Sequence, residues 1–194
     1  MMRTRTIVAK FGGTSLADAA QFKKIKAIIE EDPDRRFIVA SAPGKRFDRD
    51  VKVTDLLMDG YESAIRGEDT DFRLLQIKNR FDEIITGLDL AFPLEEEISI
   101  IRQKLAEKPE KDYVLSRGEY LNSRILAADL GFTFVDPAWC VCFDEQGRLE
   151  AAMTNRALGA ALHPLKNAVI AGFYGADMQG KIHTFSRGGS DVTG

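Results

Sequence analysis

The chain has 194 residues, of which 44% are hydrophobic and 29% are charged, and its formal net charge is −3. These values are typical of a globular protein that buries a substantial core. They disfavour nucleic acid as a main partner, because acidic and basic residues are interspersed and no basic arm or stripe is present.

Three features of the sequence bear on its location in the cell. No hydrophobic run approaches the ~20 residues that are needed to cross a membrane. The first six residues lead too quickly into a strand to form a signal peptide. Cys140 and Cys142 lack the further cysteine or histidine ligands of a zinc site. We therefore expect a cytoplasmic protein with reduced, structural thiols and no membrane partner.

The first forty residues predict a strand–helix–strand unit. Residues 6–10 and 37–40 are short, mostly apolar runs that are typical of buried strands. Between them, Ser15 to Asp18 has the spacing of a capping box and is followed by apolar residues at helical spacing. Two strands joined by one helix are expected to pair in parallel.

The next segment is predicted to be a charged loop followed by a long helical region. Residues 45–52 are expected to be mobile, either as a solvated surface loop or as a flap over a site. From Thr54 to about residue 108, apolar residues recur at helical spacing, with one break at 87–93. These apolar stripes are expected to be core.

The second half alternates again between strands and helices. Residues 113–115 are predicted to be a strand, and the helix that begins at 116–119 is expected to stop at Gly131. Glu119 would then lie in the first turn of its helix, where its negative charge interacts favourably with the positive end of the helix dipole. The remaining predicted elements are a strand at 132–135, a strand and turn within 138–149, a helix at 154–165, a strand at 168–171, and a hairpin that turns at 178–180.

Two glycine pairs, close to opposite ends of the chain, indicate an anion site. Lys-Phe-Gly-Gly-Thr-Ser at 10–15 and Arg-Gly-Gly-Ser-Asp at 187–191 each follow a short apolar strand and precede a helix start. Backbone N–H groups at such turns are uncovered and can close around an anion, and a helix N-terminus adds its positive dipole end. Two such turns, with a lysine on one and an arginine and an aspartate on the other, indicate a site that transfers phosphate.

Four motifs resemble those of aspartate kinases, which are enzymes of the amino-acid kinase family. They are the segments at 10–15 and 187–191, Lys-Val-Thr-Asp-Leu-Leu at 52–57, and Ser-Arg-Gly-Glu at 116–119. They occur in the family's order and cover the chain from end to end. The resemblance implies an α/β fold, a three-layer α/β/α sandwich with a mainly parallel central sheet that is incomplete at its C-terminus.

The same resemblance implies how the chain is organised and what it does. Residues 1–194 would be the N-terminal part of the catalytic domain, with a helical elaboration at about 55–108. The nucleotide-binding remainder and the regulatory ACT domains would lie outside this chain. The implied reaction moves the γ-phosphate of ATP, with Mg²⁺, to the side-chain carboxylate of L-aspartate, the first step of lysine, threonine and methionine biosynthesis. The full-length protein would be a homo-oligomer.

The chemistry of this reaction agrees with the residue types. A carboxylate with a pKa near ~4 is already ionised and needs no general base. Catalysis can then consist of positioning and charge stabilisation. Lys10 would neutralise the transferring phosphoryl group, and Asp191 would orient Lys10 or help to hold Mg²⁺.

The remaining roles follow from the resemblance, residue by residue. Arg187 would bind the α-carboxylate of aspartate and Glu119 its α-ammonium. The other expected substrate-binding residues are Ser41, Thr54 and Ser190. The expected phosphate-binding residues are Gly12, Gly13, Thr14, Ser15, Gly188 and Gly189.

Two alternative functions remain open from the sequence. Another amino-acid kinase would act on glutamate, a carbamate or a nucleotide, whereas Glu119 and Arg187 favour aspartate. A non-catalytic ligand-binding module could share the fold, whereas the presence of Lys10 and Asp191 favours catalysis. Because the nucleotide pocket would be half missing, we expect the chain by itself to be inactive.

Overall fold

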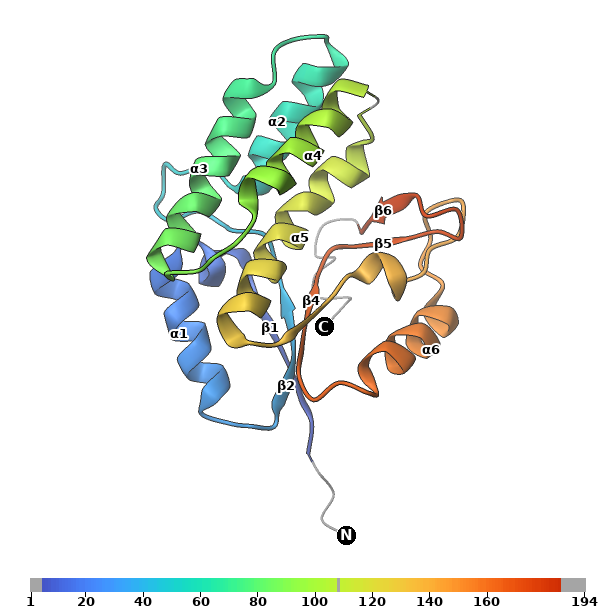
Figure 1. The fold of residues 1–194 in the computed structure, drawn as a ribbon. Helices are drawn as coiled ribbons and strands as arrows, with labels where there is room; N and C mark the ends of the chain where they lie inside the picture. Colours follow the sequence, from blue (N-terminus) through green and yellow to red (C-terminus); the bar gives the residue numbers. More distant parts are fainter. Residues whose placement is uncertain (1–4, 108, 186–194) are drawn as a thin grey trace.

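The computed structural model describes residues 5–107 and 109–185, and its centre is a parallel sheet of four strands (Figure 1). The strand order is β1-β2-β4-β3, and each neighbouring pair is parallel. The strands are β1 (Ile7–Phe11), β2 (Arg35–Ala40), β4 (Ala168–Ala171) and β3 (Thr133–Val135). Because all four run the same way, their carboxyl ends meet at one edge, where ligands bind in open α/β sheets.

Helices lie on both sides of this sheet (Figure 1). The helices α1 (Ala19–Glu30) and α5 (Lys111–Leu130) flank one side, and α6 (Ala151–Leu162) lies on the other. A short antiparallel hairpin follows β4, made of β5 (Tyr174–Ala176) and β6 (Ile182–Thr184). The predicted α/β class with a parallel central sheet is therefore confirmed, as is the opening strand–helix–strand unit.

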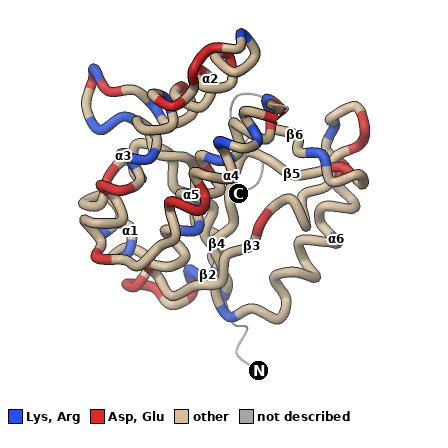
Figure 2. Tube along the Cα trace, turned by 45° about the horizontal axis from the view of Figure 1, so that its top comes forward, with Lys and Arg blue, Asp and Glu red and all other residues tan. Residues whose placement is uncertain are grey.

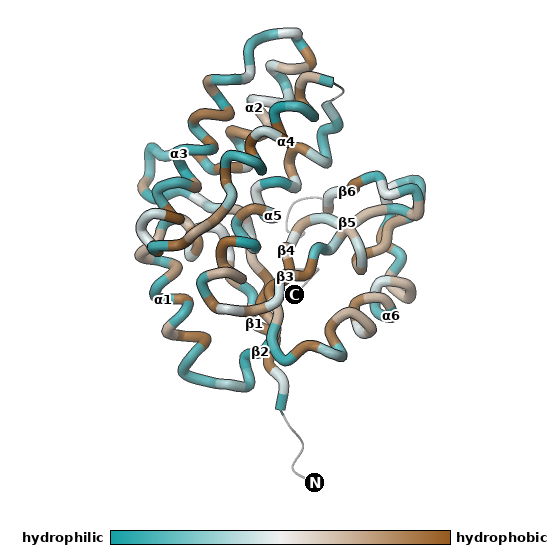
Figure 3. Tube along the Cα trace, in the orientation of Figure 1, coloured by the Kyte–Doolittle hydropathy of each residue, from teal (hydrophilic) through white to brown (hydrophobic). Residues whose placement is uncertain are grey.

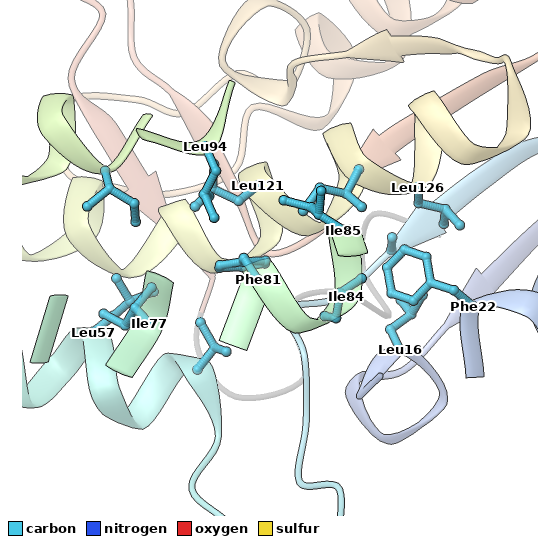
Figure 4. Packing of buried hydrophobic residues seen from close by; sticks show 14 of the residues in the cluster. Leu16, Phe22, Leu57, Ile77, Phe81, Ile84, Ile85, Leu94, Leu121 and Leu126 are labelled. Carbon is cyan, nitrogen blue, oxygen red and sulfur yellow. The ribbon is translucent and has the colours of Figure 1, made fainter. Parts of the chain in front are cut away.

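The predicted helical elaboration forms a bundle beyond the end of the sheet. It consists of α2 (Val53–Ile65), α3 (Asp71–Gly87) and α4 (Leu94–Glu107), packed with the first half of α5 (Figure 1). Apolar residues repeat along each helix (Figure 3), and they join one continuous core with the sheet. Figure 4 shows part of this core, including Phe22, Leu57, Phe81 and Leu121.

The charge distribution, the helix lengths and the state of Cys140 can be compared with the expectations from the sequence. Basic and acidic residues alternate over the described elements (Figure 2). Within residues 5–107 and 109–185, every helix is too short or too polar to span a membrane. Cys140 is buried and is not disulfide-bonded, and burial raises the pKa of its thiol to about 12.

The predicted strand at 113–115 is wrong, because α5 runs without interruption from Lys111 to Leu130. The apolar run Tyr-Val-Leu has strand propensity, but it packs on the bundle, and tertiary packing overrides local preference. Gly118 lies within this helix and allows a close approach between elements. A Cβ atom there would lie 2.9 Å from the Cβ of Ala42. Glu119 therefore lies within the helix, and the interpretation that it compensates the first turn is also wrong.

Smaller corrections concern the ends of elements. The capping box at Ser15 is not formed. Residues Gly13–Leu16 make a 3-10 turn (η1), and Asp18 caps α1 by accepting a hydrogen bond from Gln21 N at 2.9 Å. Within 138–149 the structure has isolated bridges but no regular strand. Gly131 ends α5 as predicted, with a left-handed φ of 66°.

Candidate functional site

The candidate site lies where β1 and β2 end side by side. Phe11 pairs with Ala40 at the last position of both strands. The turn after β1 then contacts the loop after β2, since Gly44 N donates to Gly13 O at 2.8 Å and Ser41 N donates to Phe11 O at 3.2 Å. The first glycine turn and the segment from Ser41 to Gly44 thus form one backbone unit.

Two glycines allow these backbones to touch. A Cβ atom on Gly13 would lie 2.7 Å from Ala42 O, and one on Gly44 would lie 2.6 Å from the carbonyl carbon of Gly13. Both distances are shorter than atoms tolerate, and the obstructing atoms are backbone. Any side chain at either position would push the two segments apart.

We expect Gly44→Ala to lower the free energy of unfolding by about 1–3 kcal/mol, because the added methyl overpacks a backbone contact. Gly159→Ala is the matched control, since Gly159 lies in α6 and a methyl group added there would have no atom within 4 Å. Alanine favours a helix over glycine by up to about 1 kcal/mol, so this control should gain stability. Urea denaturation of both variants measures the difference, and equal stabilities would contradict the close contact.

A cavity of about 220 Å³ opens beside this unit. It brings together five residues with predicted roles, which are Gly13, Thr14, Ser41, Thr54 and Glu119. Ala42, Pro43, Gly44 and Lys52 complete its lining. These residues come from η1, the loop after β2, the start of α2 and the middle of α5, so segments that are far apart in sequence share one cavity.

Glu119 is the charged group of this cavity that is set deepest in the protein. Glu119 is only 5% exposed, and its Oε2 atom has no hydrogen-bond partner among the described residues. Burial raises the pKa of its carboxyl from 4.5 to about 8, and the backbone N–H of Ala42 partly opposes this shift by hydrogen bonding. A buried carboxylate with an open oxygen is costly unless a cation pairs with it. Glu119 is therefore suited to bind an ammonium group.

The charged loop after Gly44 is held in place by Arg80 of α3. Arg80 is 4% exposed, and it donates hydrogen bonds to the carbonyl of Gly44 and to the carboxylate of Asp50. Arg46 Nε also donates to Asp50 Oδ2 at 2.9 Å. The hydrogen bonds from Arg46 and Arg80 hold the pKa of Asp50 well below its usual range. The loop that was expected to be mobile is thus tied to α3 at both of its ends.

The other predicted site residues have different places. Lys10 is an exposed residue of β1, and Gly12 follows that strand, but neither lines the cavity. Ser15 is exposed in η1. Arg187, Gly188, Gly189, Ser190 and Asp191 lie outside the described residues. The roles of all these residues stay predictions.

Comparison with models of known protein families shows which family the chain belongs to. The model of the amino acid kinase family matches residues 5–194. The chain belongs to the amino acid kinase family. The matched range includes both glycine pairs and the whole helical elaboration.

Relatives of the chain confirm the resemblance that its four motifs indicated. Aspartokinase 3 of Bacillus subtilis is 30% identical over 201 residues, which cover 96% of this chain and 44% of the relative. The aspartokinase of Chlamydia pneumoniae is also 30% identical, over 202 residues, with 96% of this chain and 43% of the relative covered. The chain thus spans less than half the length of these relatives.

Solved structures give the same relationship. Aspartate kinase of Clostridium acetobutylicum superposes with a TM-score of 0.94 at 40% identity, over 97% of this chain and 44% of that one. Aspartokinase III of Escherichia coli in complex with aspartate and ADP gives a TM-score of 0.81 at 25% identity, over 97% of this chain and 45% of that one. The fold and its topology are therefore those of aspartate kinases over the matched region.

Sequence reasoning missed two residues near the carboxyl end of the sheet. Asn122 is fully buried on α5, and its Nδ2 donates to the carbonyl of Ser41 at 2.7 Å. Phe173 follows β4 with a φ of 79°, which is strained for a residue with a side chain. Gly172 N beside it donates to Ala40 O at 3.0 Å, so this strain lies at the carboxyl end of the sheet. No sequence signal marks either contact, because both depend on distant segments.

The hairpin of β5 and β6 is docked on α5 by two side chains. Asp112 accepts hydrogen bonds from the backbone N of Thr184 at 3.2 Å and from its Oγ1 at 3.0 Å. The guanidinium of Arg117 lies over the rings of Tyr113 and Tyr120 and also reaches Tyr174 of β5, at 5.5 Å. A hollow of about 620 Å³ beside Arg117 contains none of the residues with predicted roles. Arg117, in the Ser-Arg-Gly-Glu motif, therefore packs α5 against the hairpin.

Proposed function

We propose that this chain is the amino-acid-binding part of an aspartate kinase. The observation that carries the proposal is the buried Glu119, which lines a cavity together with Ser41 and Thr54 and whose Oε2 atom has no hydrogen-bond partner among the described residues. A ligand with an ammonium group and further polar groups would satisfy this arrangement. Relatives of the chain are aspartokinases, and one solved relative holds aspartate and ADP.

Within the proposal, Glu119 binds the α-ammonium of L-aspartate, while Ser41 and Thr54 donate to its oxygens. The substrate's side-chain carboxylate is ionised and attacks the γ-phosphorus of ATP, and ADP leaves with the bridging oxygen. Lys10 and the N–H groups of the glycine turn stabilise charge on the transferring group. No proton has to be removed from the nucleophile.

Arg187, Ser190, Asp191 and the second glycine pair are proposed to complete the site, and the nucleotide is proposed to bind against residues beyond this chain. Among the described residues no group of three or more carboxylates, histidines and cysteines fits a metal ion. Mg²⁺ would depend on the ATP phosphates and on Asp191. A cytoplasmic homo-oligomer, as expected from the resemblance, is part of the same proposal.

Calorimetric titration with L-aspartate, L-glutamate and ATP–Mg²⁺ in separate runs tests the proposal. We expect saturable binding of L-aspartate, weaker or absent binding of L-glutamate, and no aspartate-dependent release of ADP by the chain alone. Glutamate is one methylene longer, and such a difference in a closed pocket changes affinity by roughly 10- to 200-fold. A folded chain that binds glutamate more tightly, or binds neither amino acid, would overturn the assignment.

A further inference from the structure

The cavity contains one acidic and one basic side chain among the described residues that line it. The acid is Glu119 and the base is Lys52, while the other lining residues are glycine, alanine, proline, serine or threonine. A ligand that carries an ammonium group and a carboxylate would be matched by this pair. Glu119 has a role in the proposed function, whereas Lys52 does not yet have one.

Lys52 occupies a position where the rules of helix formation disfavour lysine. It is the N-cap of α2, with extended backbone angles of −70° and 148°, and its side chain makes no capping hydrogen bond. N-caps favour serine, threonine, aspartate and asparagine, and a cation opposes the positive end of the helix dipole. A local conflict of this kind is expected at functional positions.

Lys52 is an exposed residue, and in the described part of the chain its side chain makes no hydrogen bond or ion pair. Its backbone, in contrast, is fixed. Val53 is fully buried and its N–H donates to Pro43 O at 3.2 Å, and Arg80 holds Asp50 two residues before Lys52. Lys52 is thus anchored in the cavity wall, with its charge available to a ligand.

We propose that Lys52 binds the side-chain carboxylate of the amino-acid substrate, opposite in charge to Glu119 at its ammonium group. This inference rests on the proposed function, in which Arg187 takes the α-carboxylate. Lys52 and Thr54 both line the cavity at the start of α2. A lysine here makes the cavity selective for an acidic side chain over its neutral amide.

The test compares L-aspartate with L-asparagine, which has nearly the same shape but no side-chain charge. The variants are Lys52→Met, Lys52→Arg and the control Lys45→Met, an exposed lysine on the same loop that does not line the cavity. Calorimetry gives both dissociation constants for each protein, and circular dichroism verifies folding. Because Lys52 makes no cap, all three variants should fold.

We expect Lys52→Met to weaken aspartate binding roughly ten- to hundred-fold while asparagine binding stays constant, so that the preference for aspartate is lost. Lys52→Arg should keep most of the preference, and Lys45→Met should keep all of it. An unchanged preference in Lys52→Met, or an equal loss for both ligands, would overturn the role of Lys52 alone. A folded wild-type chain that fails to bind aspartate would instead overturn the proposed function together with this inference.

Discussion

Replacing Glu119 by glutamine is expected to abolish aspartate binding and, at the same time, to stabilise the chain at alkaline pH. The amide keeps the shape of the side chain but cannot neutralise an ammonium group, and loss of one partner of a buried charge pair costs about 2–5 kcal/mol. Calorimetry should therefore show a loss of at least about 30-fold in affinity. Glu110→Gln, at the exposed N-cap of the same helix, is the control and should bind normally.

The gain in stability follows from the raised pKa of Glu119. The folded chain keeps a proton on this carboxyl up to about pH 8, whereas the unfolded chain loses it near 4.5. The free energy of unfolding of the wild type should therefore fall as the pH rises between these two values, and then level off. Glutamine has no such proton, so this part of the pH dependence should disappear. Urea denaturation between about pH 5 and 9 measures it.

Aspartate binding should show the opposite dependence on pH. The ammonium group of the ligand favours the ionised carboxylate, so binding below about pH 8 releases a proton from Glu119. Affinity should rise with pH up to that value and then stay constant. Calorimetry in buffers with different ionisation enthalpies counts this proton. Binding of aspartate by Glu119→Gln within a few-fold of the wild type would contradict the role of Glu119.

Replacing Arg80 by methionine is expected to have the largest effect on stability. It leaves the carboxylate of Asp50 with a single partner, Arg46, and leaves the carbonyl of Gly44 without the donor that Arg80 supplies. Breaking a buried ion pair by removing one partner costs about 3–5 kcal/mol. For a chain of this size the thermal midpoint should fall by on the order of 10 °C. Aspartate affinity should fall as well, because the loop also carries Lys52.

Two further variants show whether charge causes this effect. Asp50→Asn combined with Arg80→Met should recover part of the lost stability, because the buried carboxylate that lost its bond from Arg80 is then replaced by a neutral amide. Arg102→Met removes an exposed arginine whose partner Asp71 is also exposed, at 3.1 Å, and should cost less than about 1 kcal/mol. Equal losses in Arg80→Met and Arg102→Met would contradict the anchoring role of Arg80. The pKa of Asp50 is lowered by folding, so its stabilising contribution should be present above the ordinary aspartate range and be lost in stronger acid.

The sequence predicts the parts of the fold that depend on local pattern. The parallel pairing of β1 and β2 follows from two apolar runs joined by one helix, and the bundle follows from apolar stripes of period 3.6. The strand expected at 113–115 fails because a Tyr-Val-Leu run is ambiguous by itself. Gly118 is required by Ala42, which lies 76 positions earlier in the sequence, and no local rule contains that contact.

The same distinction applies to the site. The motifs contain Gly13 and Glu119, the family resemblance adds Ser41, and the structure places all three around one cavity. The burial of Glu119, and hence its raised pKa, depends on packing between α5 and the loop after β2. In the sequence, nothing distinguishes Arg80 from the exposed charged residues of a helix. Its burial and its contact with Gly44 emerge only when α3 and the loop are brought together.

Four residues at fixed positions along the helix α5 make four different contacts. Asp112 holds the hairpin, Gly118 admits the loop after β2, Glu119 faces the cavity, and Asn122 holds the carbonyl of Ser41. One inserted residue would turn everything beyond it by about 100° and shift it by about 1.5 Å. No single insertion or deletion between Asp112 and Asn122 can keep all four contacts. Changes of chain length in homologues should therefore accumulate in the connections between the bundle helices, while this stretch of α5 keeps its length.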